Sequence, residues 1–289
     1  MNVVLETSGL TKRYGGTAAL RGCELRLEGG KVTGLVGPNG AGKTTLLQIA
    51  VGLHRPTSGQ IRVLGLDPSR EAVALLARVG FVAQDRPLHG SFTVAETLEI
   101  GRRLNPRWDQ GYALARVKRF GLPLDRRIRS LSTGQRAQVA LTLALGKRPE
   151  ALLLDEPVAN LDPVARLEVL EELMGVVAED GPSVILSSNV LADVERVCEH
   201  VVVLVDGRVR ISGDADELVR SHVLVSGPRR AGTDNDHGEV IEIRQADRQT
   251  TRLLRGSAAP SDDGTEVRPA TLEEIVVGYL RSEREEVRQ

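Results

Sequence analysis

The sequence predicts an α/β fold whose core is a largely parallel sheet. Short apolar runs, typical of buried strands, recur along the chain, and helix-like segments separate several of them. The run at 31–37 leads into a glycine-rich turn, and a helix-like segment follows at once at 43–52. Such alternation favours a sheet with helices packed on its faces. The other candidate strands are 61–64, 79–83, 151–154, 184–187 and 201–205.

The composition is that of a folded protein without a dominant charge. The chain has 289 residues, 41% of them hydrophobic and 27% charged, which suffices for one large domain with an appendage or for two domains. A net charge of -1 gives no overall attraction to nucleic acid, so we expect no nucleic-acid partner. Cys23 and Cys198 lack the spacing of a disulfide framework or a zinc site, which favours a reducing cytoplasm. Since no apolar run reaches the ~18 residues that cross a bilayer and no signal-peptide pattern is present, we expect a chain that is neither exported nor self-anchored.

Two further features surround this core. Alternating apolar residues at 3–5 and 18–27 predict antiparallel strands near the start of the chain. Residues from about 88 to 147 carry mainly a helical pattern, which predicts an inserted helical subdomain. Asp206-Gly207 separates two apolar runs and is a strong signal for a tight β-hairpin.

The character of the sequence changes after about residue 220. The stretch 227–238 is rich in glycine, proline, aspartate and asparagine, and we interpret it as a linker or long loop. A small β module and a closing helix at 272–281 are expected to follow, and Thr271 and Glu274 have the spacing of a capping box. We therefore expect a main domain over 1–220 and a C-terminal accessory module over 221–289.

The glycine-rich turn fills every fixed position of the motif G-x-x-x-x-G-K-[ST]. Backbone N–H groups of such a loop converge on phosphate oxygens, and the start of the next helix adds its partial positive charge. Lys43 would then meet the β and γ phosphates of ATP, and the Thr44 hydroxyl would bind Mg²⁺. The alternative is an ordinary strand–turn–helix loop, which requires no such motif. The expected ATP-binding residues are Gly37, Pro38, Asn39, Gly40, Ala41, Gly42, Lys43, Thr44 and Thr45.

A second candidate site follows the apolar run 151–154, which ends in Asp155-Glu156-Pro157. In P-loop enzymes an acidic residue at the end of such a strand holds Mg²⁺, and an adjacent one orients the attacking water. We assign Asp155 to the metal and Glu156 to the water. A polar turn that closes a buried strand is the alternative. With the phosphate-binding loop, these residues predict a P-loop NTPase (RecA-like) core with an antiparallel β subdomain, an inserted helical subdomain and a small C-terminal extension.

These residues resemble those of the ATP-binding-cassette (ABC) ATPases over 5–218. The segment 131–135, Leu-Ser-Thr-Gly-Gln, is similar to the family signature Leu-Ser-Gly-Gly-Gln and precedes the acidic strand as in the family. Taken alone, Ser132 and Gln135 also fit a plain helix cap. The resemblance implies that Ser132, Gly134 and Gln135 contact the γ-phosphate of ATP held by a second subunit, so that two cassettes close on two nucleotides.

Three further positions resemble functional residues of the family. Gln84, after the run 79–83, is similar to a glutamine that senses Mg²⁺ and the membrane partner, and it would act both as a catalytic residue and as a metal ligand. Tyr14 occupies the place of an aromatic residue that stacks on adenine, and Asp162 belongs to a loop that meets the other subunit. Each has a plainer interpretation: a strand-end glutamine, a strand-edge tyrosine, and a helix N-cap before Pro163.

The sequence departs from the family pattern at two positions. Thr133 replaces a glycine of the signature, and Asn189 stands where the family has a histidine that touches the γ-phosphate. We count Asn189 among the catalytic candidates because its amide can donate a hydrogen bond, although it cannot become cationic or relay a proton. Two functions therefore remain open: an ATPase that drives transport, and an ATP-gated regulatory subunit with little hydrolysis.

The resemblance also implies partners. A single cassette without a membrane span would power a separate integral-membrane permease from the cytoplasmic face of the cell membrane, with a second ABC subunit as its homo- or heterodimer partner. The segment 270–276 resembles tails of the exporter branch that is associated with drug, antibiotic or lipid efflux. The basic residues within 116–129 would lie on a solvated helix face or, as the alternative, toward the membrane.

Overall fold

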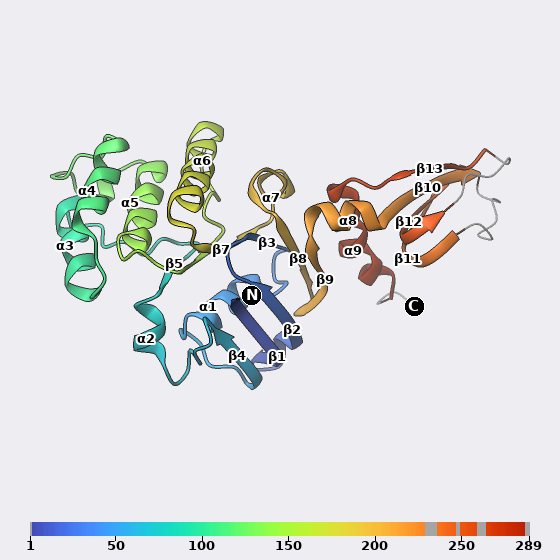
Figure 1. Ribbon diagram of the computed structural model, residues 1–289, viewed down its shortest axis with the longest axis horizontal. Coiled ribbons are helices and arrows are strands. Elements are labelled where there is room, and N and C mark those ends of the chain that lie inside the picture. The colour runs from blue at the N-terminus through green and yellow to red at the C-terminus, as the bar shows by residue number, and fades with distance from the viewer. Residues whose placement is uncertain (1, 229–235, 247–248, 259–263, 287–289) are drawn as a thin grey trace.

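The computed structural model describes residues 2–228, 236–246, 249–258 and 264–286. A central sheet lies between a group of helices at one end and a smaller sheet at the other, and a second antiparallel sheet packs below it in the view of Figure 1. The α/β class is confirmed, including the antiparallel β subdomain and the helical insertion. None of the helices in these described ranges is long and apolar enough to cross a membrane.

The central sheet has six strands in the order β5-β6-β7-β3-β8-β9. The first five are parallel, and only β9 runs antiparallel. Both faces are covered: Leu152 and Leu154 pack into one hydrophobic core, and the intervening Leu153 packs into the other. Burial on both faces explains why these strands read as continuous apolar runs. The strands are β3 (Val32–Val36), β5 (Val79–Val82), β6 (Ala151–Asp155), β7 (Ser183–Ser188), β8 (His200–Val205) and β9 (Arg208–Asp214).

Helices cover this sheet, and the predicted turn closes its last hairpin. Asp206 and Gly207 both have positive φ, 47° and 75°, as a two-residue hairpin loop between right-twisted strands requires. The hairpin prediction is therefore confirmed. The helices of the core are α1 (Lys43–Ala50), α2 (Ala72–Leu76), α6 (Pro163–Asp180) and α7 (Leu191–Val197).

The antiparallel subdomain has the strand order β2-β1-β4, from β1 (Val3–Tyr14), β2 (Thr17–Glu28) and β4 (Ser58–Val63). The run 61–64 was expected among the buried strands of the core, but β4 instead pairs antiparallel with β1. Its exposed Arg62 lies between two buried apolar residues, the alternation of a strand with one solvated face. That alternation is the signal that separates β4 from the core strands.

The helical insertion contains α3 (Val94–Leu104), α4 (Gln110–Arg119), the 3-10 helix η1 (Ile128–Ser130) and α5 (Thr133–Leu145). It has a hydrophobic core of its own, to which Leu98, Val117 and Val139 contribute. Helix α5 begins at a capping box in which Ser132 Oγ accepts from Gln135 N at 3.1 Å and Gln135 Oε1 accepts from Ser132 N at 3.0 Å. The start of α5 is thereby fixed by local sequence.

An ion pair joins this insertion to α6. The Arg116 Nη1 on α4 donates to Glu172 Oε1 on α6, and both side chains are only 5% exposed. The expectation that the basic residues within 116–129 share a solvated face is therefore wrong for Arg116. Its charge is tolerated because a carboxylate meets it inside the protein.

Replacing Arg116 by alanine is expected to lower the free energy of unfolding by about 3 kcal/mol, because Glu172 would remain buried without its main partner. Arg119→Ala is the matched control: Arg119 contacts the same carboxylate at 3.3 Å but is 65% exposed, so its loss should cost less than about 1 kcal/mol. Urea denaturation of the two variants measures the difference. Equal changes in the free energy of unfolding would contradict this account of the Arg116–Glu172 ion pair.

The C-terminal module is a four-stranded antiparallel sheet, β11-β12-β10-β13, with a helix packed on it. The expected small β module and closing helix are present, and Thr271 N donates to Glu274 Oε2 at 2.9 Å as the capping box predicts. Within the expected linker 227–238, residues 229–235 lie outside the described residues, and the flanking residues belong to strands. The elements of the module are β10 (His222–Pro228), β11 (Asp236–Gln245), β12 (Gln249–Ala258), β13 (Glu266–Pro269) and α9 (Leu272–Glu286), and α8 (Ala215–Ser221) leads into them from β9.

The module is packed on the main core and shares hydrophobic residues with it. Leu224, Leu253 and Ile275 belong to the same buried cluster as Val201 of β8. Helix α9 contacts β8 as well as β11 and β12. We propose a boundary at residue 220, which falls at the end of α8, just before β10 begins.

Candidate functional site

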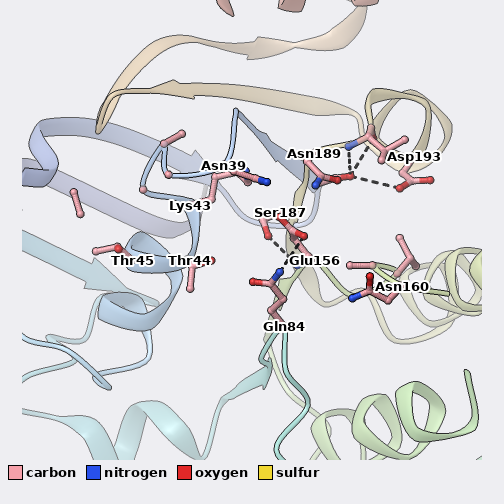
Figure 2. A pocket seen from close by; sticks show the side chains of 18 of the residues that line it. Asn39, Lys43, Thr44, Thr45, Gln84, Glu156, Asn160, Ser187, Asn189 and Asp193 are labelled. Atoms are coloured by element: carbon pink, nitrogen blue, oxygen red, sulfur yellow. Dashed lines mark hydrogen bonds between the residues drawn. The ribbon is translucent and has the colours of Figure 1, made fainter. Parts of the chain in front are cut away.

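A cavity of about 640 Å³ opens at the carboxyl ends of β3, β6 and β7. This is where α/β proteins usually bind ligands, because the loops that leave the parallel strands meet at that edge. Figure 2 shows Lys43 and Thr44 on one side of the cavity, with Gln84, Glu156 and Asn160 facing them. Of the residues expected in the site, the structure brings together around this cavity Tyr14, Asn39, Gly40, Ala41, Gly42, Lys43, Thr44, Thr45, Gln84, Glu156 and Asn189.

The phosphate-binding loop links β3 to α1, as the sequence predicts. Two of its glycines are required by close backbone approach. A Cβ at Gly37 would lie 2.2 Å from the carbonyl oxygen of Leu204, and one at Gly42 would lie 2.4 Å from that of Ala19. Gly42 also has φ of 104°, which side chains disfavour. The loop therefore holds its shape through packing against β8 and β2.

Lys43 lies across this loop and is 5% exposed. Its Nζ donates to the carbonyl oxygens of Gly37 at 2.6 Å and Pro38 at 3.2 Å. Burial lowers the pKa of Lys43, while the nearby carboxylates of Glu156 and Asp155 act in the opposite direction. A phosphate in the cavity would offer this ammonium group a stronger, charged acceptor than either carbonyl.

Glu156 immediately follows β6 and has a left-handed backbone, with φ of 45°. Its N–H donates to Ser187 Oγ at 2.9 Å, and the same Ser187 hydroxyl donates to Asp155 Oδ1 at 2.7 Å. From the other side, Gln84 Nε2 donates to Glu156 Oε2 at 3.3 Å (Figure 2). The Glu156 carboxylate thus lies in the cavity between two strand ends.

Ser187 is a site residue that the sequence analysis missed. It is fully buried and lies directly opposite Asp155 in the parallel register of β6 and β7. The available signal was a hydroxyl directly after the apolar run 184–186, near the carboxyl end of β7. Asp193 and Arg166 were also missed: both line the cavity, and Arg166 Nε donates to Asp193 Oδ1 at 2.6 Å.

Tyr14 and the residues of the 131–135 segment differ in their relation to the cavity. Tyr14 lines it and is 44% exposed. Ser132, Gly134, Gln135 and Asp162 do not line it; Ser132 and Asp162 cap α5 and α6, whose starts lie close together. A Cβ at Gly134 would be 3.1 Å from the Cβ of Ala165 on α6. These residues lie outside the cavity of their own chain.

The oxygen donors around the cavity fit Mg²⁺. Among the described residues there is no group of three His, Cys, Asp or Glu side chains able to hold a metal. Mg²⁺ does not need one, because it is usually bound through one or two carboxylates together with substrate phosphates and waters. Thr44, Gln84 and Glu156 line the cavity and carry side-chain oxygens. Asp155 is 1% exposed and does not line it; the Ser187 hydroxyl, which donates to Asp155, lies between the two. The metal assignment of Asp155 thus requires contact through Ser187 or through a water molecule.

Comparison with known proteins gives concordant matches. Residues 20–159 match the family model described as "ABC transporter". The chain is 37% identical to a daunorubicin resistance ATP-binding protein of Streptomyces coeruleorubidus, over 75% of this chain and 70% of that one. It is 33% identical to a Nod factor export ATP-binding protein of Paraburkholderia xenovorans, over 93% of this chain and 84% of that one.

A solved structure shares the fold. It is a dimeric ATP-binding cassette in a post-hydrolysis state, bound to ADP and phosphate, with a TM-score of 0.65 and 26% sequence identity. The match covers 73% of this chain and 98% of the cassette.

Proposed function

The chain belongs to the ABC transporter family, as an ATP-binding subunit with ATPase activity, and we propose that it uses Mg²⁺-ATP to drive export through a separate membrane permease. One observation carries this proposal: a single cavity lies between the phosphate-binding loop and the Glu156 carboxylate. A triphosphate held by the loop would bring its terminal phosphate toward that carboxylate.

The loop residues account for nucleotide binding. Backbone N–H groups at 39–45, at the start of α1, would surround the β and γ phosphates, and Lys43 would turn from its two carbonyl acceptors toward them. Bound Mg²⁺ would neutralise charge on the phosphate oxygens. Thr44 and Gln84 would contact it directly and Asp155 indirectly, and the exposed ring of Tyr14 would stack on adenine.

Glu156 is the proposed general base for hydrolysis. Its carboxylate would accept a proton from the attacking water while Gln84, which already donates to it, keeps it oriented. Asn189 would donate its amide N–H to the γ-phosphate, in the role of the histidine usual in the family. No proton has to pass through Asn189 in this arrangement.

A second cassette would complete the site. Ser132, Gly134 and Gln135 lie outside the cavity of their own chain, at the start of α5, where N–H groups and the helix dipole favour a phosphate. We propose that they meet ATP bound by the partner subunit and that Asp162 lies at the same interface. The dimeric state of the solved cassette supports this arrangement.

Export is the proposed direction of transport. The similar proteins from Streptomyces coeruleorubidus and Paraburkholderia xenovorans are named for daunorubicin resistance and Nod factor export. We infer a cytoplasmic position at the inner face of the membrane, reached through the permease. Co-purification from membranes, followed by identification of the bound integral-membrane protein, tests this inference; recovery of the chain without such a partner would contradict it.

The low-turnover alternative, based on Asn189, finds no support in the comparisons. Because an amide donor preserves one hydrogen bond to phosphate, Asn189→His is expected to change kcat by less than about tenfold. Steady-state ATPase assays with Mg²⁺, with EDTA as the metal-free control, measure this. A histidine variant that is faster by two orders of magnitude would revive the regulatory alternative.

A further inference from the structure

Arg86 joins two loops of the site although it does not itself line the cavity. It follows Gln84 by two residues, and its Nη2 donates to the carbonyl oxygens of Pro157 at 2.6 Å and Ala159 at 3.1 Å. Both acceptors belong to the segment directly after Glu156. The Arg86 side chain therefore links the segment after β5 to the loop that leaves β6.

That loop is conformationally strained and needs external support. Glu156 has φ of 45°, a left-handed conformation that costs most residues other than glycine about 1 kcal/mol. Asn160, with φ of 61°, adopts the same region at less cost because asparagine tolerates it. The loop has two internal backbone hydrogen bonds, from Ala159 N to Glu156 O at 3.1 Å and from Leu161 N to Val158 O at 3.4 Å. Strained backbone of this kind persists where surrounding contacts determine it.

The contacts come from two sides. On the strand side, Ser187 Oγ accepts from Glu156 N. On the opposite side, Arg86 binds the carbonyls of the next residues while Gln84 contacts the Glu156 carboxylate itself. Charged donors give stronger hydrogen bonds than neutral ones, so Arg86 is the strongest of these supports.

Arg86 is itself held in an unusual conformation. Its φ is 45°, its N–H donates to Ala83 O at 3.0 Å, and its side chain is half-buried. Burial, and then the charge of Arg136, lower the pKa of Arg86. Glycine would close this turn without strain, because it adopts positive φ freely. The turn alone therefore does not explain an arginine at this position, whereas the contacts of its side chain with Pro157 and Ala159 do.

We propose that Arg86 is a positioning residue for ATP hydrolysis, which fixes the loop after Glu156 so that the Glu156 carboxylate stays aligned with the attacking water. This inference rests on the role of Glu156 proposed above. It also means that a displacement of the segment 84–86 reaches Glu156 by two routes, through the Gln84 side chain and through the main chain of Pro157 and Ala159.

The test compares Arg86→Gly, which removes the guanidinium and relieves the backbone, with Arg86→Lys, which keeps the charge but replaces the rigid, planar guanidinium with a compact ammonium group on a flexible stem. Arg78→Ala is the matched control. Arg78 precedes β5 as Arg86 follows it, and it also donates two hydrogen bonds, to Glu150 at 3.0 and 2.6 Å, away from the cavity. ATPase kinetics, calorimetric binding of a non-hydrolysable Mg²⁺-ATP analogue and melting temperature are measured for each.

Arg86→Gly is expected to lower kcat by about ten- to a hundredfold, the effect of a misaligned catalytic group, with KM and analogue affinity within about twofold of wild type. Arg86→Lys should retain an intermediate kcat, and millimolar guanidinium ion should restore part of the rate of Arg86→Gly. Arg78→Ala should keep wild-type kcat. A purely structural role would instead lower the melting temperature of Arg86→Gly without a selective loss of kcat.

The inference is overturned if Arg86→Gly turns over like wild type or like Arg78→Ala, or if its loss of rate is matched by loss of analogue binding. Glu156→Gln is measured in parallel, so that a failure of the role proposed for Arg86 can be distinguished from a failure of the role proposed for Glu156. If Glu156→Gln is inactive and Arg86→Gly is fully active, only the role of Arg86 is wrong. If Glu156→Gln remains fully active, the proposed role of Glu156 fails, and the role of Arg86 fails with it.

Discussion

Replacement of Lys43 by alanine is expected to weaken Mg²⁺-ATP binding by about ten- to a hundredfold, because a charge-assisted contact to phosphate of about 1.5–3 kcal/mol is lost. The Lys43 ammonium is the one basic group of the phosphate-binding loop, and it lies 2.6 Å from a carbonyl at the floor of that loop. No neighbouring side chain of the loop can supply the missing charge, since 37–42 contains only Gly, Pro, Asn and Ala.

Lys147→Ala is the control for this experiment. Lys147 is half-buried, and its Nζ also donates to a carbonyl, that of Leu76 at 2.8 Å, but it lies outside the cavity. Burial lowers the pKa of Lys147 to about 8, so the two lysines share a desolvated environment. Calorimetry should show wild-type affinity for Lys147→Ala. Unchanged affinity in Lys43→Ala would mean that the triphosphate does not bind in this loop.

The parts of the site that sequence could predict are those carried by contiguous motifs. The loop 37–45 and the pair Asp155-Glu156 can each be recognised from a few consecutive residues, because the phosphate-binding groups lie in one turn and the carboxylates at one strand end. The local caps at Ser132, Asp162 and Thr271 were predictable for the same reason and are present as hydrogen bonds.

Residues that reach the site through sheet register could not be predicted in this way. Ser187 meets Asp155 because β6 and β7 pair in parallel, which joins positions 32 residues apart. Arg86 meets Pro157 across 71 residues. Nothing within either segment indicates the other, since the pairing depends on the order of strands in the whole sheet.

The fold shows the same division between local and long-range information. Most strands and helices were predictable from apolar periodicity, but the run 61–64 was assigned to the wrong kind of strand, and the partner of Arg116 was not foreseen. In the C-terminal module, β10 lies between β12 and β13 and so pairs with two strands that come much later in the chain. Periodicity identifies such strands but not their neighbours.

Substitution of Glu156 by glutamine is expected to lower kcat by about a hundred- to ten-thousandfold, the usual contribution of a general base, while ATP binding is retained. The change removes only the proton-accepting charge: glutamine is isosteric, can still accept from Gln84 Nε2, and keeps the backbone N–H that Ser187 accepts. Since ATP would bind without being consumed, two cassettes should remain closed on two nucleotides, and size-exclusion chromatography with Mg²⁺-ATP should show an accumulated dimer.

Glu150→Gln provides a matched control, because Glu150 precedes β6 as Glu156 follows it, and its carboxylate binds Arg78 and Arg107 at the amino end of that strand. Its kcat should equal that of wild type, and its dimer should dissociate as ATP is hydrolysed. If Glu156→Gln turned over as fast as Glu150→Gln, another group would have to activate the water. Asp155 could not take that role in the observed arrangement, since it is 1% exposed and its Oδ1 is already occupied by Ser187.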